Sequence, residues 1–337
     1  MFRGMNAPRA TPTDYIDMVI GSPAVVTATE AARVQPAGDH APAHDAFTRL
    51  LHRLEPDADA LWAETRPLAD LGRGALVIDD TTLDKPYARR IRPVTRHWSG
   101  KHRAVVQGIN VITVLWTDGD RLVPCDYRVY DKAADGLTKN DHFAAMLSAA
   151  RDRGFRPECV LFDGWYSSLA NLKQVRDFGW IFLTRLKSNR LVRVAGGPEL
   201  PVVRQPISPT GTDVWLPGFG VIRVFRLVAP NGDTTHWATN DAGMDEVTRL
   251  KWAEWSWGIE EFHRGLKQHT GVEGCQCRAT RAQVNHIGLC LRAFVRLEWH
   301  RFTTGISWFE AKQRIIRDAV RRYIERPLYN LPDMATA

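Results

Sequence analysis

The spacing of hydrophobic residues changes twice along the chain. In the first 70 residues, apolar side chains recur at helical spacing only over residues 45–54, where Phe47, Leu50 and Leu51 share one face. We predict an amphipathic helix there, preceded by a loosely ordered arm over residues 1–40 with at most one short helix. The predicted helix either belongs to a small DNA-binding unit or packs on the main domain.

From residue 75 the pattern changes to short apolar runs that are typical of strands. Pro124 favours an edge or bulged position for the third of these strands, and Ser167 is the expected N-cap of a helix. The expected order is strands at 75–79, 104–116 and 121–130, a helix at 141–154, a strand at 159–162, a helix at 167–178 and a strand at 180–183. Three meandering strands followed by alternating helices and strands predict a five-stranded mixed sheet with helices on its faces.

The last part of the chain combines a β-rich segment with helices. Short apolar runs between Pro and Gly residues predict strands at 202–204, 214–216, 221–227 and 236–239, and helical spacing returns over 245–269, 283–302 and 308–324. The predicted α/β organisation has five parts: an N-terminal arm and helical region (1–70), the first part of a catalytic core (71–190), a β-rich insertion (191–240), the second part of the core (241–305), and a C-terminal helix and tail (306–337).

Charge and cysteine content narrow the class of protein. The net charge is +7, but residues 1–70 carry six Lys or Arg against ten Asp or Glu, which leaves +11 for the remainder. A basic core favours a polyanionic partner, foremost nucleic acid, although solvated cationic faces are common. Five cysteines without a C-x-x-C pair argue against a disulfide framework and a zinc module. No apolar run reaches the ~18 residues of a membrane span, so we expect a soluble cytoplasmic protein.

Two aspartates and a glutamate are the candidate chemistry. Asp80 and Asp163 end the first and fourth predicted strands, which are neighbours in a sheet of this order. Two close carboxylates repel each other, and a hard divalent cation between them relieves that repulsion. With Glu260 from a helix on the sheet they would form an acidic triad for Mg²⁺ or Mn²⁺. The alternative is that each aspartate only caps a turn; Asp79, by strand alternation, is expected on the opposite side from Asp80.

Positive charge surrounds these acids in the sequence. Glu260, Arg264 and Lys267 are spaced to share one stripe of a helix, and Glu261 lies one step off it. Residues 85–103 contain no acidic residue and seven basic ones, which we predict to contact DNA phosphates, namely Lys85, Arg89, Arg90, Arg92, Arg96, Lys101 and Arg103. A solvated loop is the alternative. The chain lacks the sequence motifs of ATP-binding, dinucleotide-binding and serine-hydrolase sites.

Three segments resemble a known family. Residues 78–82 (Ile-Asp-Asp-Thr-Thr), 161–166 (Leu-Phe-Asp-Gly-Trp-Tyr) and 257–267 are similar to insertion-sequence transposases of the DDE class, in the group with a Tyr-Arg-Glu-Lys signature. The resemblance implies an RNase H-like catalytic fold in which Asp80, Asp163 and Glu260 bind two metal ions and Lys267 contacts DNA near the cut. It also implies double-stranded DNA as transposon ends and target, a homodimer, and a prokaryotic protein associated with the nucleoid.

The signature is incomplete in this chain. Its Tyr and Arg positions hold Ala253 and Ser256, so a hairpin intermediate is not implied, and Arg264 is a possible substitute for the missing positive charge. Trp215 and Trp237 could stack on an unpaired base, although core packing is the commoner role of Trp. The sequence therefore predicts a DNA transposase that cleaves element ends and joins them to target DNA. The alternatives are a stand-alone nuclease of this fold and a catalytically silent DNA-binding protein.

Overall fold

The computed structural model describes residues 8–24, 26–38, 41–99 and 104–329. Within these ranges eleven strands form one mixed sheet. The strands are β1 (Ala75–Asp84), β2 (Thr95–Ser99), β3 (Ala104–Thr117), β4 (Leu122–Tyr130), β5 (Cys159–Phe162), β6 (Phe182–Leu186), β7 (Leu191–Val194), β8 (Glu199–Pro201), β9 (Thr212–Leu216), β10 (Gly220–Val228) and β11 (Thr234–Thr239).

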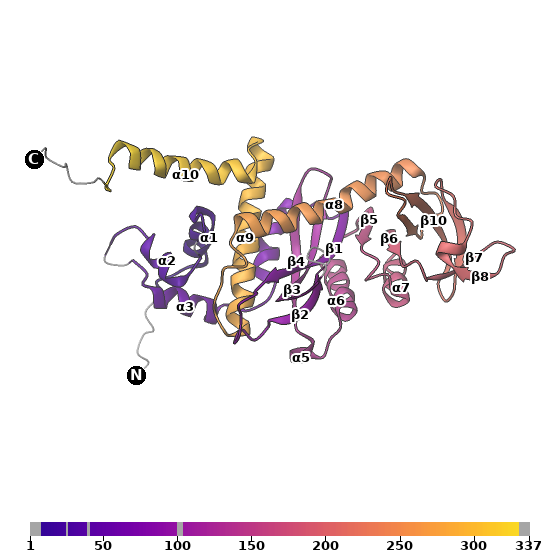
Figure 1. The fold of residues 1–337 in the computed structure, drawn as a ribbon, viewed down its shortest axis with the longest axis horizontal. Helices are drawn as coiled ribbons and strands as arrows, with labels where there is room; N and C mark the ends of the chain where they lie inside the picture. Colours follow the sequence, from indigo (N-terminus) through magenta and orange to yellow (C-terminus); the bar gives the residue numbers. More distant parts are fainter. Residues whose placement is uncertain (1–7, 25, 39–40, 100–103, 330–337) are drawn as a thin grey trace, which may run out of the picture.

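Helices flank this sheet along its length (Figure 1). They are α1 (Pro12–Gly21), α2 (Ala28–Arg33), α3 (His44–Arg53), α4 (Asp59–Thr65), α5 (Lys132–Asp135), α6 (Lys139–Asp152), α7 (Leu169–Asp177), α8 (Glu246–His269), α9 (Thr280–Thr304) and α10 (Trp308–Glu325), with short 3-10 helices η1 (Arg66–Leu68) and η2 (Val202–Arg204). None of the helices in the described ranges is long and apolar enough to cross a membrane.

The five predicted core strands are present and joined in the predicted way. Their order across the sheet is β4-β3-β1-β5-β6, with β3 antiparallel to β1 and with β1, β5 and β6 parallel. The register of β3 against β4 shifts at Val114 and Leu115, as expected for a bulged strand that contains Pro124. The α/β fold class with a mixed core sheet, flanking helices and a helical C-terminal part is confirmed.

Several local predictions were wrong. Strand β2 was missed, and the strands of the predicted β-rich insertion continue the core sheet, because β11 pairs with β6. Residues 202–204 form the 3-10 helix η2. The N-cap of α7 is Ser168, whose hydroxyl accepts the Asn171 N–H, whereas the Ser167 hydroxyl donates to the Gly164 carbonyl.

The N-terminal region is more ordered than its composition indicates. Helix α1 begins with a capping box between Thr11 and Asp14, and its apolar face is buried. The Tyr15 hydroxyl lies 2.9 Å from Nδ1 of His286 on α9, which ties this helix to the C-terminal half of the chain. The expectation of a loosely ordered arm is therefore wrong for the described part of residues 1–40.

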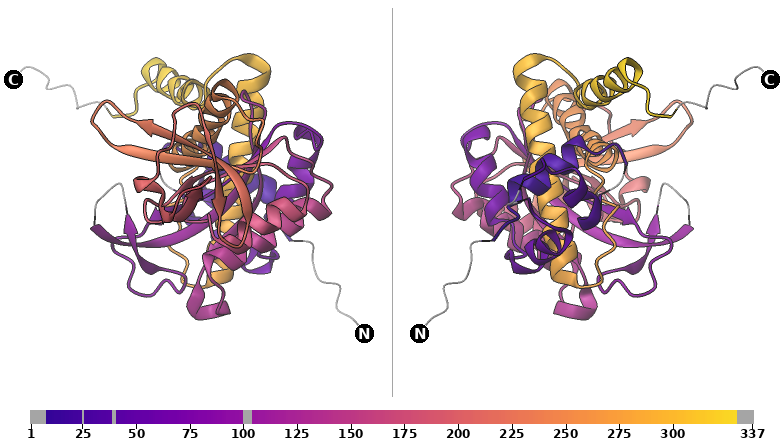
Figure 2. Two further views of the ribbon diagram at one scale, coloured as in Figure 1. Left: turned by 90° about the vertical axis from the view of Figure 1, so that its right-hand side faces the viewer. Right: turned by 90° about the vertical axis from the view of Figure 1, so that its left-hand side faces the viewer.

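Alternating residues of β1 face two different hydrophobic layers. Leu76 and Ile78 pack in the layer that contains α6 and α7, and Val77 packs in the layer that contains α8 and α9. Figure 2 shows α8 and α9 on the opposite side of the sheet from α6 and α7. The two consecutive aspartates that follow Ile78 must therefore point to different sides of the sheet.

Candidate active site

Asp79 and Asp80 lie where β1 passes the end of its neighbour β5. The parallel register pairs Val77 with Leu161 and Ile78 with Phe162. The next position on each strand is an aspartate, Asp79 on β1 and Asp163 directly after β5. Asp79 points to the same side of the sheet as Val77, the side covered by α8. The sheet therefore places Asp79 next to Asp163.

A tight turn fixes Asp163. The Tyr166 N–H donates to the Asp163 carbonyl over 3.0 Å. A Cβ atom at Gly164 would lie 2.9 Å from the Arg185 carbonyl oxygen, so a larger residue would push β6 away from the turn. Glycine at this position lets the chain leave β5 closely packed on β6, with the Asp163 side chain exposed.

Helix α8 supplies the third acid. Asp245 caps the helix by accepting the Thr248 N–H over 2.7 Å, and Ile259 and Phe262 are buried against the sheet. This anchoring leaves the neighbouring Glu260 exposed along the edge of the sheet. The predicted use of this helix to present a carboxylate to the sheet agrees with its placement.

The three carboxylates line one cavity of about 200 Å³. The other residues around it include Arg185, Trp237, Ser256 and Trp257. Burial, and then the negative charges of Asp80, Glu260 and Asp163, raise the pKa of Asp79 well above its usual value. Carboxylates this close together repel one another, and a bound divalent cation relieves that repulsion.

Asp80 does not face this cavity, contrary to the prediction. Its carboxylate accepts hydrogen bonds from the Lys139 ammonium (2.7 Å), the Asn110 amide (2.6 Å) and the Tyr166 hydroxyl (2.7 Å), on the α6 side of the sheet. Burial opposes ionisation, but Lys139 and these hydrogen bonds together lower the pKa of Asp80. The alternation used in the prediction was right, but the assignment of faces was reversed.

Asp79, Asp163 and Glu260 line one cavity, but their side chains do not yet form a complete metal site. Among the described residues, no three His, Cys, Asp or Glu side chains are already placed to hold one ion. The carboxylate oxygens of Asp79, Asp163 and Glu260 are nevertheless the hard donors that Mg²⁺ and Mn²⁺ prefer, and they line the same cavity. These residues fit a divalent ion in donor type and charge, and side-chain rotation would have to bring them together.

Sequence reasoning missed Arg185. This residue is the cross-strand partner of Trp237 on β11, and its guanidinium lies 5.0 Å from the centre of the indole ring. The stacked pair places an exposed positive charge at the rim of the acidic cavity. Trp237 is only 7% exposed, so it supports Arg185 within the sheet. Trp215 lies on β9, outside the residues that line the cavity.

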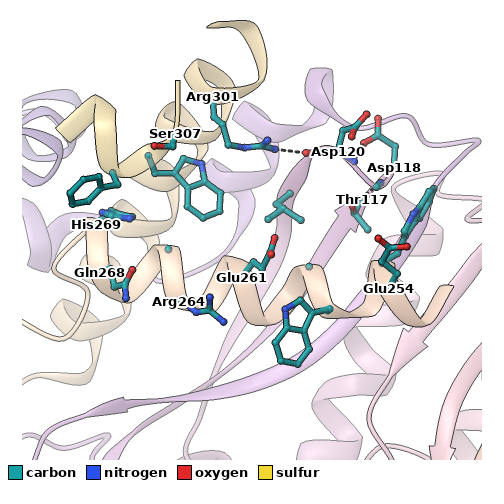
Figure 3. A pocket seen from close by; sticks show the side chains of 18 residues that line it. Thr117, Asp118, Asp120, Glu254, Glu261, Arg264, Gln268, His269, Arg301 and Ser307 are labelled. Atoms are coloured by element: carbon teal, nitrogen blue, oxygen red, sulfur yellow. Dashed lines mark hydrogen bonds between the residues drawn. The ribbon is translucent and has the colours of Figure 1, made fainter. Parts of the chain in front are cut away.

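Arg264 and Glu261 belong to a second, larger groove. Its volume is about 1,050 Å³, and it lies between α8, the β3–β4 turn and the start of α10. Figure 3 shows both side chains among the residues that line it, with Arg301 across from them. Because each helical residue turns by about 100°, Arg264 is rotated from Glu260 toward Glu261. The rotation is only about 40°, so the two residues are neighbours on the helix as predicted, but Glu260 lines the acidic cavity and Arg264 lines the larger groove.

Lys267 is tied to the backbone of β1. Its ammonium donates to the Thr82 carbonyl over 2.7 Å, which fixes α8 against the strand that carries Asp79. Lys267 is partly exposed, and its contact with DNA stays a prediction.

The basic segment 85–103 separates into buried and exposed residues. Lys85 is 4% exposed, and its ammonium donates to the carbonyls of Glu273 and Cys275, so its prediction as a DNA contact was wrong. The exposed basic side chains are Arg89, Arg90, Arg92 and Arg96. Lys101 and Arg103 lie outside the described residues. The exposed arginines have no acidic partner among the ion pairs of the described residues.

The family comparison agrees with this arrangement. Residues 18–209 match the model of a family described as DDE superfamily endonuclease. This match spans more than half of the chain, and the chain belongs to the DDE superfamily of endonucleases. Members of this superfamily act with divalent metal ions. A search of curated protein sequences gives no significant match.

Similarity to solved structures concerns the fold. The chain is similar to the piggyBac transposase in a synaptic complex with hairpin DNA, with a TM-score of 0.52, 12% identity, and coverage of 100% of this chain and 78% of the other. The Drosophila P element transposase strand transfer complex matches at a TM-score of 0.29 and 9% identity, covering 96% of this chain and 87% of that one. The first match supports a transposase-like catalytic fold.

Proposed function

We propose that this protein is a DNA transposase that cleaves the ends of its element with divalent metal ions and joins the freed 3′ ends to target DNA. The observation that carries the proposal is the single cavity lined by Asp79, Asp163 and Glu260 in a DDE endonuclease fold. We further propose that residues 71–190 and 241–305 form the catalytic core. Residues 1–70, the 191–240 segment and residues 306–337 surround it.

The metal would be Mg²⁺ or Mn²⁺, and two ions suit this chemistry. Two ions about 4 Å apart activate the attacking oxygen and stabilise the leaving oxygen of an in-line phosphoryl transfer. Asp79, Asp163 and Glu260 would hold them through carboxylate oxygens. Arg185 would contact a non-bridging oxygen of the same phosphate, because its guanidinium lies at the rim of the cavity and its planar fork of N–H donors matches the geometry of a phosphate.

Arg185 offers a test of this assignment. We expect Arg185→Gln to slow metal-dependent strand cleavage by about 100-fold, with DNA affinity changed less than about 10-fold. Arg185→Lys should recover only part of the rate, since an ammonium does not reproduce the planar fork. Single-turnover cleavage with a labelled duplex measures both. Arg193→Gln on β7 is the matched control, as another exposed arginine outside the cavity; an equal effect there would refute the role.

Exposed arginines after β1 are the proposed phosphate contacts. Arg89, Arg90 and Arg92 follow the strand that carries Asp79 and are exposed. Replacing all three with Gln should lower the slope of log affinity against log salt by about 2 to 3, because each lost phosphate contact removes about 0.9. Fluorescence anisotropy at several salt concentrations measures this slope. An unchanged slope would make the segment a solvated loop.

The proposed assembly is a homodimer that holds two DNA ends. Helix α10 extends away from the body of the protein (Figure 1) and has apolar side chains exposed along its length. They are Phe309, Ile315, Val320, Tyr323 and Ile324. Four of them, Phe309, Val320, Tyr323 and Ile324, lie within about 100° of one another around the helix axis, and an uncovered apolar face of this kind is typical of an association surface. Double-stranded DNA, as element ends and target, completes the proposed set of partners.

The test of the proposal is cleavage of DNA from the borders of the gene. We expect nicks at element ends with Mg²⁺ or Mn²⁺, none with a chelator, and transfer of the 3′ ends to a second DNA. Cleavage without strand transfer would favour a stand-alone nuclease. DNA binding without cleavage in the presence of any metal would favour a catalytically silent DNA-binding protein. These are the two alternatives that share this fold.

A further inference from the structure

Two cysteines lie close together in the loop that connects α8 and α9. Cys275 is 4% exposed, and Cys277 is partly exposed. Only Gln276 separates them in the chain, and the Lys85 ammonium, which donates to the Cys275 carbonyl, places a positive charge beside this segment. The remaining cysteines, Cys125, Cys159 and Cys290, are buried and have no partner of this kind among the described residues.

The backbone of this loop is held from two sides. The Lys85 ammonium donates to the carbonyls of Glu273 (2.6 Å) and Cys275 (2.8 Å). The buried Gln283 amide donates to the carbonyls of Cys275 (3.1 Å) and Cys277 (2.6 Å). Because four hydrogen bonds fix the backbone on which both cysteines lie, one residue apart, this short segment is held in place, and Cys277 is the more exposed of its two thiols.

We propose that Cys277 is a peroxide-reactive thiol and that Cys275 resolves the oxidised product to a disulfide. This modification site is independent of the DNA chemistry and goes beyond it. A thiolate is the reactive species, and partial exposure beside a cation is the environment that favours it. The neighbouring Cys275 thiol, and then the charge of Lys85, lower the pKa of Cys277 although burial acts in the opposite direction.

The reaction balances with a hydroperoxide as the oxidant. The Cys277 sulfur attacks the terminal peroxide oxygen, the O–O bond breaks, and the sulfur becomes a sulfenic acid while the peroxide is reduced to water or an alcohol. The Cys275 sulfur then attacks the Cys277 sulfur, the S–O bond breaks, and the departing hydroxide takes the Cys275 thiol proton as water. A small thiol reductant reverses the disulfide by exchange.

The other thiols provide an internal comparison. Burial raises the pKa of Cys125 and Cys290 to about 12 in each case, and it raises that of Cys159 well above its usual value. In the folded protein these three are therefore both shielded and protonated. A single protein sample thus contains one thiol expected to react and three expected to stay inert.

The test is peptide mapping of the full chain after brief treatment with hydrogen peroxide. We expect a 275–277 disulfide, a mass loss of about 2 Da that dithiothreitol reverses, and iodoacetamide labelling of Cys277 at least about 10-fold faster than of Cys125, Cys159 or Cys290. In Cys275→Ser, a dimedone adduct should appear at Cys277 instead of the disulfide. In Cys277→Ser, neither product should form.

Two results would overturn the proposal. One is labelling of Cys277 no faster than that of the three buried cysteines, which the wild-type protein alone can show even if a variant fails to fold. The other is peroxide oxidation that yields no 275–277 disulfide, or that yields the dimedone adduct at another cysteine in Cys275→Ser.

Discussion

Asp79→Asn, Asp163→Asn and Glu260→Gln should each reduce metal-dependent DNA cleavage by at least about 1,000-fold while leaving DNA binding within a few-fold of wild type. Each variant removes one of the three carboxylates that line the acidic cavity and leaves the side-chain shape almost unchanged. Metal ions held by the remaining two acids would be misplaced for in-line attack. Single-turnover cleavage in Mg²⁺, with binding measured in Ca²⁺, separates the two effects.

The choice between the two consecutive aspartates makes this experiment decisive. Asp80 faces Lys139 on the other side of the sheet, so Asp80→Asn should keep substantial cleavage in the folded fraction of the protein. Glu261→Gln is the matched control on α8, since Glu261 lines the larger groove instead. If Asp80→Asn abolishes cleavage and Asp79→Asn does not, the catalytic assignment proposed from the structure is wrong and the one made from sequence is right.

The sequence could predict the core sheet because its signals are local. Apolar runs, the Asp118-Gly119-Asp120 turn and the helical spacing after residue 245 identify each element within a window of a few residues. The same signals could not assign the faces of β1. Leu76 and Ile78 on one side and Ala75 and Val77 on the other are all apolar, and helices cover both sides of the sheet. Only the three-dimensional packing of α8 shows that this helix covers the side of the sheet to which Asp79 points.

The sequence could not predict side-chain roles that depend on partners far away in the chain. Lys85 looked like one of seven basic residues for DNA, but the carbonyls that bury its ammonium are 188 and 190 residues away. Arg185 was overlooked because the strand was expected to end at residue 183, and its partner Trp237 lies on a strand of the supposed insertion. Arg185 lies two residues after the apolar run that ends at Leu183, and a charge so close to the end of such a run is the local signal that could have found it.

The largest effect on stability is expected from the Asp80–Lys139 pair. The two side chains are only 18% and 19% exposed, and Asp80 also accepts from Asn110 and Tyr166. Removing one member leaves the other charge buried without its partner, which costs about 3 to 5 kcal/mol. We expect Lys139→Met and Asp80→Asn each to lower the free energy of unfolding by an amount in this range. Urea unfolding monitored by circular dichroism measures it.

The double variant distinguishes a paired charge from simple loss of packing. With both charges removed, Asp80→Asn together with Lys139→Met should be less destabilised than the sum of the single variants by about 2 kcal/mol, because no unpaired ion remains. Asp177→Asn is the control for a surface pair, since Arg176 and Asp177 are 42% and 62% exposed, and it should change stability by less than about 1 kcal/mol. If the losses of free energy at positions 80 and 139 are additive, Lys139 does not stabilise Asp80 through its charge. The contacts of Asp80 with Asn110 and Tyr166 would then account for its effect on stability.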